Sequence, residues 1–156
     1  MKRSITIFVF ILYLFFFSGT IGLQDEDPNV VVSQNITTDV GIIEIQGIIN
    51  SINQARKTPL KVSPFLTQSA TIRACDMFEK QLWSHDGYTN YLWGAGYSGT
   101  DVGENLARHF NDDEVVYRAW LASPAHNEVM TYEKFRYIGI GHCGDYVVAH
   151  FGTTIR

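Results

Sequence analysis

Two β-strands joined by a two-residue connection limit the fold of this chain more than any other feature. Residues 135–143 and 146–151 are rich in aromatic and β-branched side chains, and only Gly144 and Asp145 separate them. A connection of this length that contains glycine is typical of a tight antiparallel hairpin. The helical patterns lie upstream of it. The sequence therefore predicts an α+β fold in which helices pack on a small antiparallel sheet.

Two helices are predicted in the first half of the chain. The first ends near Lys57, before Pro59, and isoleucines recur along it at helical spacing. These are Ile45, Ile48, Ile49 and Ile52. The second runs from Pro64 to about Gln81, because Ser63 is a favoured N-cap and proline is favoured at the first helical position. Its buried face is predicted to carry Leu66, Ala70, Ala74, Met77 and Phe78.

A third helix is predicted between the second helix and the hairpin. Residues 111–114 form a capping box and place acidic side chains at the positive end of a helix. This helix is expected to direct four side chains inward. They are Val115, Val116, Ala119 and Trp120. After Pro124 a short helical turn leads towards the hairpin, and residues 60–62 form a short extended link earlier in the chain.

Residues 83–101 contain many glycines and aromatic residues but little periodicity, so we predict a long loop. Long ordered loops in compact domains usually line a functional site. The aromatic side chains of this loop either form a ligand-binding wall or anchor the loop on the core by burial. They are Trp83, Tyr88, Tyr91, Trp93 and Tyr97.

The N-terminus has the pattern of an export signal. Lys2 and Arg3 precede an apolar run over residues 5–17, and small residues follow it. We predict that residues 1–22 are a cleaved signal peptide, with an uncleaved N-terminal anchor as the alternative. The folded part of the chain is then secreted or otherwise lies outside the cytoplasm.

The rest of the chain is predicted to contain a spacer and one domain. Residues 23–38 are an acidic flexible spacer, and residues 39–156 are long enough to form a single core. Without residues 1–22 the chain has 10 basic and 16 acidic side chains, a net charge of −6 with histidine neutral. This balance argues against non-specific binding to nucleic acid. We expect a monomer that contacts a membrane only through an uncleaved N-terminus.

Cys75 and Cys143 are the two cysteines of the chain. Disulfides form outside the cytoplasm, and a bridge between these two would join the second helix to a strand end. Two buried free thiols are the alternative. The sequence does not fix the distance between the two residues, so both possibilities stay open.

Three polar side chains are candidates for one pocket. Glu104 lies in Gly103-Glu104-Asn105-Leu106-Ala107, His126 lies in Ser123-Pro124-Ala125-His126, and His85 precedes both. Two neutral imidazoles and a carboxylate are ligands that suit zinc, with a fourth position open to water. The structural alternatives are that Glu104 holds backbone N–H groups of the 83–101 loop and that His126 caps the following turn.

Other candidates for chemistry are weaker. His109 is expected to be exposed or half-buried at a strand end, and His142 and His150 are expected to pack on a sheet face. No serine has the G-x-S-x-G setting of a hydrolase nucleophile. The serines concerned are Ser84, Ser98 and Ser123.

Several short motifs follow one another in a fixed order. They are Ser84-His85, Ala95-Gly96-Tyr97, Gly103-Glu104-Asn105-Leu106-Ala107, Ser123-Pro124-Ala125-His126, Ile138-Gly139-Ile140-Gly141 and His150-Phe151-Gly152. In this order they resemble the CAP superfamily, also called SCP-like, which contains cysteine-rich secretory proteins, antigen 5 and pathogenesis-related proteins. The resemblance covers roughly residues 47–152 and is to the short prokaryotic form.

The resemblance implies a three-layer α-β-α sandwich with a surface cavity. In the family, two histidines and two acidic residues can line that cavity and hold a divalent cation. His85 and His126 match the histidines, and Glu104 matches the first acid. The second acid has no clear counterpart, because Leu121-Ala122-Ser123 leads directly to Pro124.

The residues and the resemblance together favour a secreted, non-enzymatic CAP domain. Its cavity is expected to bind a divalent cation, with zinc the best fit, or a small ligand such as a sterol, another lipid, or an envelope or host component. A metal-dependent hydrolase is the first alternative, with His85 and His126 as ligands and Glu104 as ligand or general base. A structural or adhesive envelope protein is the second.

Overall fold

The computed structural model of the protein describes residues 44–154. The predicted signal peptide (1–22) and spacer (23–38) lie outside these residues. The described elements are α1 (Ile45–Gln54), β1 (Lys61–Val62), α2 (Pro64–Lys80), α3 (Tyr88–Gly94), β2 (Val102–Arg108), α4 (Asp113–Ala122), α5 (Pro124–Thr131), β3 (Tyr137–Cys143) and β4 (Tyr146–Gly152). None of the helices within residues 44–154 has both the length and the apolar character needed to cross a membrane.

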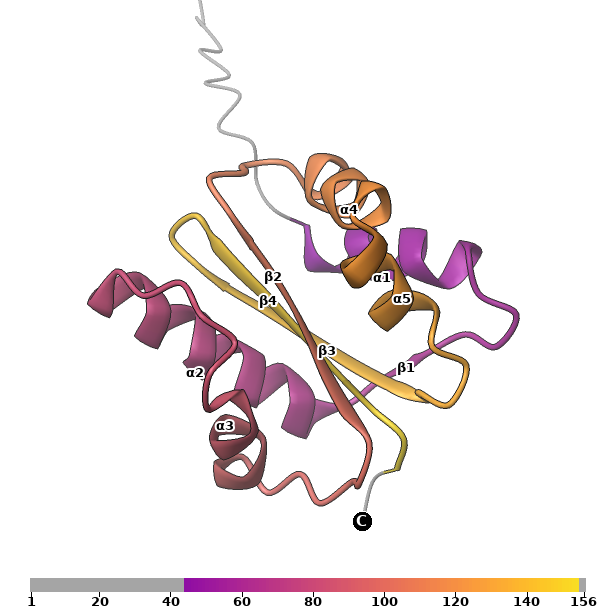
Figure 1. The fold of residues 1–156 in the computed structure, drawn as a ribbon, viewed down its shortest axis with the longest axis horizontal. Helices are drawn as coiled ribbons and strands as arrows, with labels where there is room; N and C mark the ends of the chain where they lie inside the picture. The colour runs from indigo at the N-terminus through magenta and orange to yellow at the C-terminus, as the bar shows by residue number, and fades with distance from the viewer. Residues whose placement is uncertain (1–43, 155–156) are drawn as a thin grey trace, which may run out of the picture. The chain divides into compact units, whose positions relative to one another are not determined.

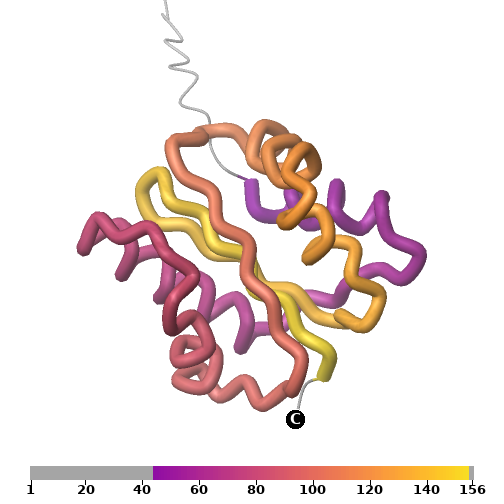
Figure 2. The backbone as a smooth tube through the Cα atoms, in the orientation of Figure 1, coloured from indigo at the N-terminus to yellow at the C-terminus, as the bar shows by residue number. Residues whose placement is uncertain are grey.

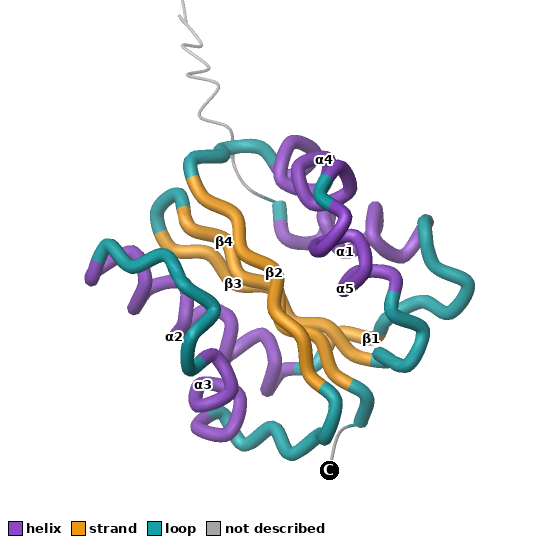
Figure 3. Tube along the Cα trace, in the orientation of Figure 1, coloured by secondary structure: helices purple, strands orange, loops and turns teal. Residues whose placement is uncertain are grey.

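The four strands form one sheet in the order β1-β3-β4-β2 (Figure 3). β3 and β4 pair antiparallel around the Gly144-Asp145 turn, which confirms the hairpin. β2 pairs antiparallel with the other side of β4. β1 adds two residues parallel to β3. The prediction of a purely antiparallel sheet is therefore wrong for this one strand. β4 is a central strand whose seven residues are all buried, and β2 is an edge strand.

Helices cover both faces of the sheet, which confirms the three-layer α-β-α arrangement (Figure 1, Figure 2). α1, α4 and α5 lie on one face, and α2 and α3 lie on the other. Alternate residues of β4 serve the two faces, because successive side chains of a strand point in opposite directions. Ala149 and Phe151 belong to the core that includes α1 and α4, whereas Tyr146 and Val148 belong to the core that includes α2.

α2 lies very close to β3 at two glycines. A Cβ atom on Gly139 would be 2.0 Å from the backbone nitrogen of Thr67, and one on Gly141 would be 2.3 Å from that of Thr71. Only a residue without a side chain permits this approach. The buried face of α2 therefore rests directly on the sheet, and it carries Arg73 into the interior.

A disulfide joins Cys75 of α2 to Cys143 at the end of β3, with 4.8 Å between the Cα atoms. Of the two possibilities that the sequence left open, the structure has the bridge. It fixes the C-terminal half of α2 to the hairpin end of the sheet.

The structure corrects two predictions about where elements end. α1 ends at Gln54, because Arg56 turns into the interior and binds the main-chain oxygens of Met130 and Phe135. The segment 83–101 is not all loop, since it contains α3. This helix begins after Gly87, whose φ is +69°, and it has no side-chain cap of the kind that marks a helix start in a sequence.

Three side chains predicted to be buried or packed on the sheet are instead exposed. Val115 is 45 % exposed, because Val116 and Trp120 define the buried side of α4. Phe78 is 39 % exposed and makes an edge-to-face contact with the buried Tyr146. His142 is exposed near the end of β3, next to the turn.

Candidate functional site

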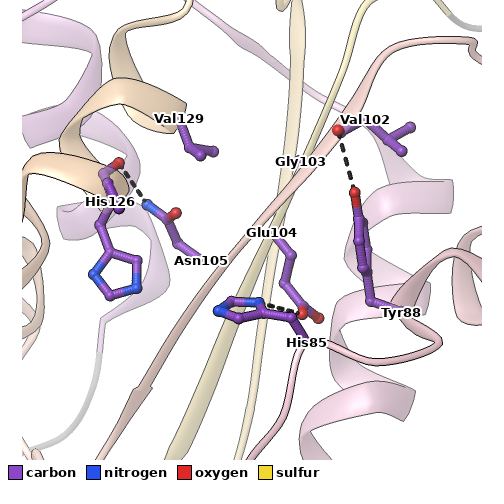
Figure 4. Close-up of a pocket in the computed structure, with 9 residues that line it drawn as sticks. His85, Tyr88, Val102, Gly103, Glu104, Asn105, His126 and Val129 are labelled. Atoms are coloured by element: carbon purple, nitrogen blue, oxygen red, sulfur yellow. Dashed lines mark hydrogen bonds and ion pairs between the residues drawn. The ribbon is translucent and has the colours of Figure 1, made fainter.

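A cavity of about 350 Å³ lies beside β2 and contains all three predicted site residues (Figure 4). Its walls come from the segment before α3, from the first residue of α3, from β2 and from α5. The lining residues are His85, Tyr88, Val102, Gly103, Glu104, Asn105, Ala125, His126 and Val129. The fold thus brings His85, Glu104 and His126 into one pocket, although they come from three separate segments.

Glu104 is buried at the centre of a polar network. Its side chain is 1 % exposed, and Oε1 accepts a hydrogen bond from His85 Nδ1 at 2.9 Å. Oε2 accepts from Arg73 Nε at 3.2 Å and from His150 Nε2 at 3.1 Å. The β2–β4 register places Glu104 opposite His150, so both side chains lie on the α2 face of the sheet.

The hydrogen bonds to the Glu104 carboxylate indicate which ring nitrogen of His85 and His150 carries the proton. An ionised carboxylate only accepts hydrogen bonds, so the proton of each histidine lies on the nitrogen that faces Glu104. For His150 this leaves Nδ1 without a proton, 2.7 Å from the hydroxyl of Ser69, whose single proton is shared between Nδ1 and the main-chain oxygen of Leu66 at 3.0 Å. For His85 it leaves Nε2 with its lone pair available.

Arg73 links the network to the segment before α3. Its guanidinium, with the side chain 6 % exposed, donates to the main-chain oxygen of Ser84 at 2.6 Å and lies 4.9 Å from the ring centre of Tyr91. The structural alternative considered for Glu104 therefore occurs in a different form. Glu104 holds Arg73 and His85, and Arg73, rather than the carboxylate, binds the backbone before α3.

α5 supplies the opposite wall of the pocket. Pro124 begins this helix and places His126 in its first turn, where the main-chain oxygen of His126 accepts from Asn105 Nδ2 at 3.0 Å. Burial lowers the pKa of His126, and the electrostatic interaction with His85 lowers it further. His85 lies at the rim with its side chain 56 % exposed.

Burial shifts two further groups around Glu104. The pKa of His150 is lowered, mainly because its ring is buried, although the Glu104 carboxylate opposes this shift. The pKa of Tyr88 is raised by burial and by the negative charge of Glu104, and its hydroxyl donates to the main-chain oxygen of Val102 at 3.3 Å. Both groups are neutral near neutral pH.

Sequence reasoning did not identify Arg73, His150 or Ser69 as parts of the site. One signal was present for Arg73, since it lies at helical spacing among the buried residues of α2. A cation at such a position indicates a buried partner. His150 was expected to pack on the sheet; it is buried, but it also pairs with a residue 46 positions away.

A sequence profile of CAP, the cysteine-rich secretory protein family, matches residues 49–151. The chain belongs to the CAP family. The Bacillus subtilis protein YkwD is 29 % identical to it over 89 residues, which are 54 % of this chain and 35 % of YkwD. The chain therefore spans about a third of the length of this curated relative.

Solved structures share the CAP fold at low sequence identity. An extracellular protein containing an SCP domain from Bacillus anthracis has a TM-score of 0.66 and 22 % identity, covering 70 % of this chain and 40 % of that one. A cysteine-rich secretory protein from Staphylococcus aureus has a TM-score of 0.64 and 19 % identity, with 70 % and 38 % covered. An outer surface protein from Borrelia burgdorferi has a TM-score of 0.64 and 22 % identity, with 69 % and 90 % covered.

The cation site that the CAP resemblance implied does not fit this arrangement as a three-ligand centre. Within residues 44–154, no group of three or more His, Cys, Asp or Glu side chains is placed to hold a metal ion. Glu104 is already paired with Arg73, whose positive charge opposes a cation at the same carboxylate. Ser123 separates α4 from α5, and no second acid joins the pocket lining among the described residues.

The aromatic residues of the CAP domain divide between the two predicted roles. Tyr88 lines the pocket. Tyr97 is 2 % exposed and packs on Leu66 and Leu92, which anchors the segment on the core. The remaining three line no part of this pocket; they are Trp83, Tyr91 and Trp93. His109 follows β2, is exposed as expected, and pairs with Asp145 away from the pocket.

Proposed function

We propose that this CAP domain is an extracytoplasmic, non-enzymatic module that binds a small ligand in the β2 pocket. The observation that carries the proposal is the lining, in which His85, Tyr88 and His126 accompany apolar side chains around about 350 Å³. Sites for small ligands are cavities of this kind, in which a few polar groups orient the ligand against a mainly apolar wall. Envelope or host components with several polar groups fit this lining better than a sterol, which has a single hydroxyl group on a large apolar skeleton.

The hydrogen bonds of Glu104 support binding rather than hydrolysis. A metal-dependent hydrolase would need Glu104 as a ligand or as a general base. Both of its oxygens already accept hydrogen bonds from side chains of the protein. Among the described residues, the pocket lining contains no Ser, Thr or Cys that would supply a nucleophile.

Two observations support a location outside the cytoplasm. The N-terminal residues have the pattern of an export signal. The similar Bacillus anthracis and Borrelia burgdorferi proteins are described as extracellular and outer surface proteins. N-terminal sequencing of the protein from cell fractions and culture medium tests this part, since a start after residue 22 in the medium distinguishes cleavage from an anchor.

Ligand capture with a filled pocket tests the binding proposal. The exported protein is incubated with the small-molecule fraction of a cell-envelope extract and examined by native mass spectrometry. Ala125 is exposed and lines the pocket, so Ala125→Phe fills the cavity without disturbing the core. Ala122→Phe, at an exposed position outside the lining, is the matched control. We expect an adduct in the wild type and the control but not in Ala125→Phe; equal adducts in all three would refute the proposal.

A divalent cation bound by His85 and His126 is a second candidate occupant. Burial lowers the pKa of His126, which keeps its imidazole neutral and able to act as a ligand. Calorimetric titration with zinc, alongside His85→Ala, His126→Ala and Glu104→Gln, tests it. Saturable binding that is lost in both histidine variants supports the cation, and unchanged heats in either variant refute it. Loss in Glu104→Gln as well would restore the carboxylate as a ligand.

A further inference from the structure

The pocket lies at the open edge of the sheet rather than over one of its faces. Glu104 and Asn105 are consecutive in β2, so their side chains point to opposite faces. Both nevertheless line the same cavity. Figure 4 shows Glu104 and Asn105 on the two sides of the strand, with His85 and Tyr88 beyond the first and His126 and Val129 beyond the second. Because β2 is an edge strand, the cavity follows its unpaired side.

Two side chains from the helical layers already use main-chain oxygens on this side of β2. Tyr88 donates its hydroxyl to Val102 O at 3.3 Å, and Trp120 donates Nε1–H to Leu106 O at 2.9 Å. Backbone polar groups of a strand alternate between its two sides. Glu104 lies midway between Val102 and Leu106, so its N–H and C=O also point away from β4. Towards β4, in contrast, His109 N–H bonds to Asp145 O.

The main chain of Glu104 is therefore open within the pocket. Among the described residues, no hydrogen bond from outside the β2–β4 ladder reaches its N–H or C=O. The Glu104 side chain is 1 % exposed whereas the whole residue is 6 % exposed, so the remaining exposure lies on the main chain. A donor and an acceptor held side by side at a strand edge form a template for another strand.

We propose that the pocket binds a short extended peptide, which pairs with Glu104 as an added β-strand. This inference rests on the proposed ligand-binding function and names the class of its ligand. One residue of an extended chain presents an N–H and a C=O on the same side and exchanges both bonds with the residue opposite. A single trans amide, such as that of an acetamido sugar, points its two groups in opposite directions and satisfies only one of the two.

The edge and the walls limit the peptide to a few residues. Tyr88 and Trp120 close the edge at Val102 and Leu106, which are about 13 Å apart along a strand. The side chain of the peptide residue that pairs with Glu104 lies on the same face as His85 and Tyr88, and its neighbours point towards α5. The walls therefore favour a polar central side chain between two small ones, because Ala125, His126 and Val129 together limit the space on the α5 side.

Nuclear magnetic resonance with three probes tests this pairing on the exported protein. The probes are acetyl-alanyl-seryl-alanyl-amide, the same peptide methylated on the serine nitrogen, and N-acetylglucosamine. We expect the first to bind saturably, to shift the Glu104 amide proton and to slow its hydrogen exchange. N-methylation removes one donor and is expected to weaken binding about three- to tenfold. Ala125→Phe is expected to abolish the shift and Ala122→Phe to keep it.

Each other result overturns the pairing. Equal affinity for the two peptides would show that the peptide does not form the predicted hydrogen bond with the main chain of Glu104. The proposed pocket function would still stand. A shift caused by N-acetylglucosamine but by neither peptide would replace the peptide by an amino-sugar ligand. No shift with any probe would also reject the peptide, whereas the adduct experiment with the envelope extract decides separately whether the pocket binds a ligand.

Discussion

The buried pair of Glu104 and Arg73 leads to a sharp prediction about stability. The two charges are 3.2 Å apart, with side chains 1 % and 6 % exposed. At an effective dielectric constant of about 20, their attraction is about 5 kcal/mol. Glu104→Gln removes the charge but keeps the shape and one acceptor, which retains about 1 kcal/mol of hydrogen bonding. We therefore expect the free energy of unfolding to fall by about 3–5 kcal/mol.

Urea denaturation followed by tryptophan fluorescence measures this change. An exposed pair on α4 provides a matched control, because Arg118 and Glu114 are also bonded at 2.8 Å but have side chains 73 % and 49 % exposed. Glu114→Gln removes the same charge in solvent and is expected to cost under about 1 kcal/mol. The difference between the two glutamine variants isolates the effect of burial.

A double-mutant cycle identifies Arg73 as the partner. Arg73→Met removes the guanidinium and leaves the carboxylate buried without its counter-charge, so it also destabilises the fold. In the double variant with Glu104→Gln neither charge remains, and we expect a coupling of about 2 kcal/mol. A coupling near zero, or a cost of Glu104→Gln as small as that of Glu114→Gln, would refute the argument that this pair braces the pocket.

Three further predictions follow from the fold. Replacing Cys75 and Cys143 by alanine opens a loop between residues 68 positions apart and is expected to lower the free energy of unfolding by about 4 kcal/mol in chemical denaturation. The pKa of His150 is lowered by burial, so below about pH 6.5 the unfolded chain binds a proton that the native protein excludes. The free energy of unfolding measured with urea should therefore decrease as the pH is lowered from about 7 to about 5, by up to about 1.4 kcal/mol per pH unit, and His150→Gln should flatten this dependence. Gly139→Ala forces a Cβ atom to 2.0 Å from the backbone of α2 and should cost at least about 3 kcal/mol, whereas Gly94→Ala, with nothing within 4 Å, should change stability by under about 1 kcal/mol in thermal denaturation.

Local sequence signals predicted most of the elements because they depend on neighbouring residues. Ser63 and Pro64 mark the start of α2, and the structure has the Ser63 side chain accepting from the main-chain nitrogen of Leu66. Gly144 and Asp145 mark the hairpin. α3 was missed because its start depends on a glycine with positive φ rather than on a polar cap. The signal peptide lies outside the described residues and stays a prediction.

The polar network around Glu104 could not be predicted from the sequence, because it depends on how α2 is positioned on the sheet and on the register between β2 and β4. Arg73 meets Glu104 only when the Gly139 contact sets the height of α2 on the sheet. His150 meets Glu104 only when β2 pairs with β4 in the observed alignment. A slip of one residue in that alignment would turn Glu104 to the opposite face, towards α5. The order of the CAP motifs pointed to the three pocket residues, but it carried no information on Arg73.

Arg73 also stabilises the pocket by supplying a counter-charge to the buried Glu104 carboxylate. A buried carboxylate requires a counter-charge, and either a metal ion or a guanidinium can supply it. Here the guanidinium of Arg73 does so, and it binds Ser84 O at the same time, which holds the segment carrying His85 against β2. Arg73 therefore both supplies the counter-charge of Glu104 and connects two walls of the pocket. With the Glu104 side chain engaged, the groups left for a ligand include His85 Nε2, the His126 imidazole, Asn105 Oδ1 and the main chain of Glu104. Recognition by main-chain pairing thus follows from the same contacts that argue against a carboxylate-bound metal.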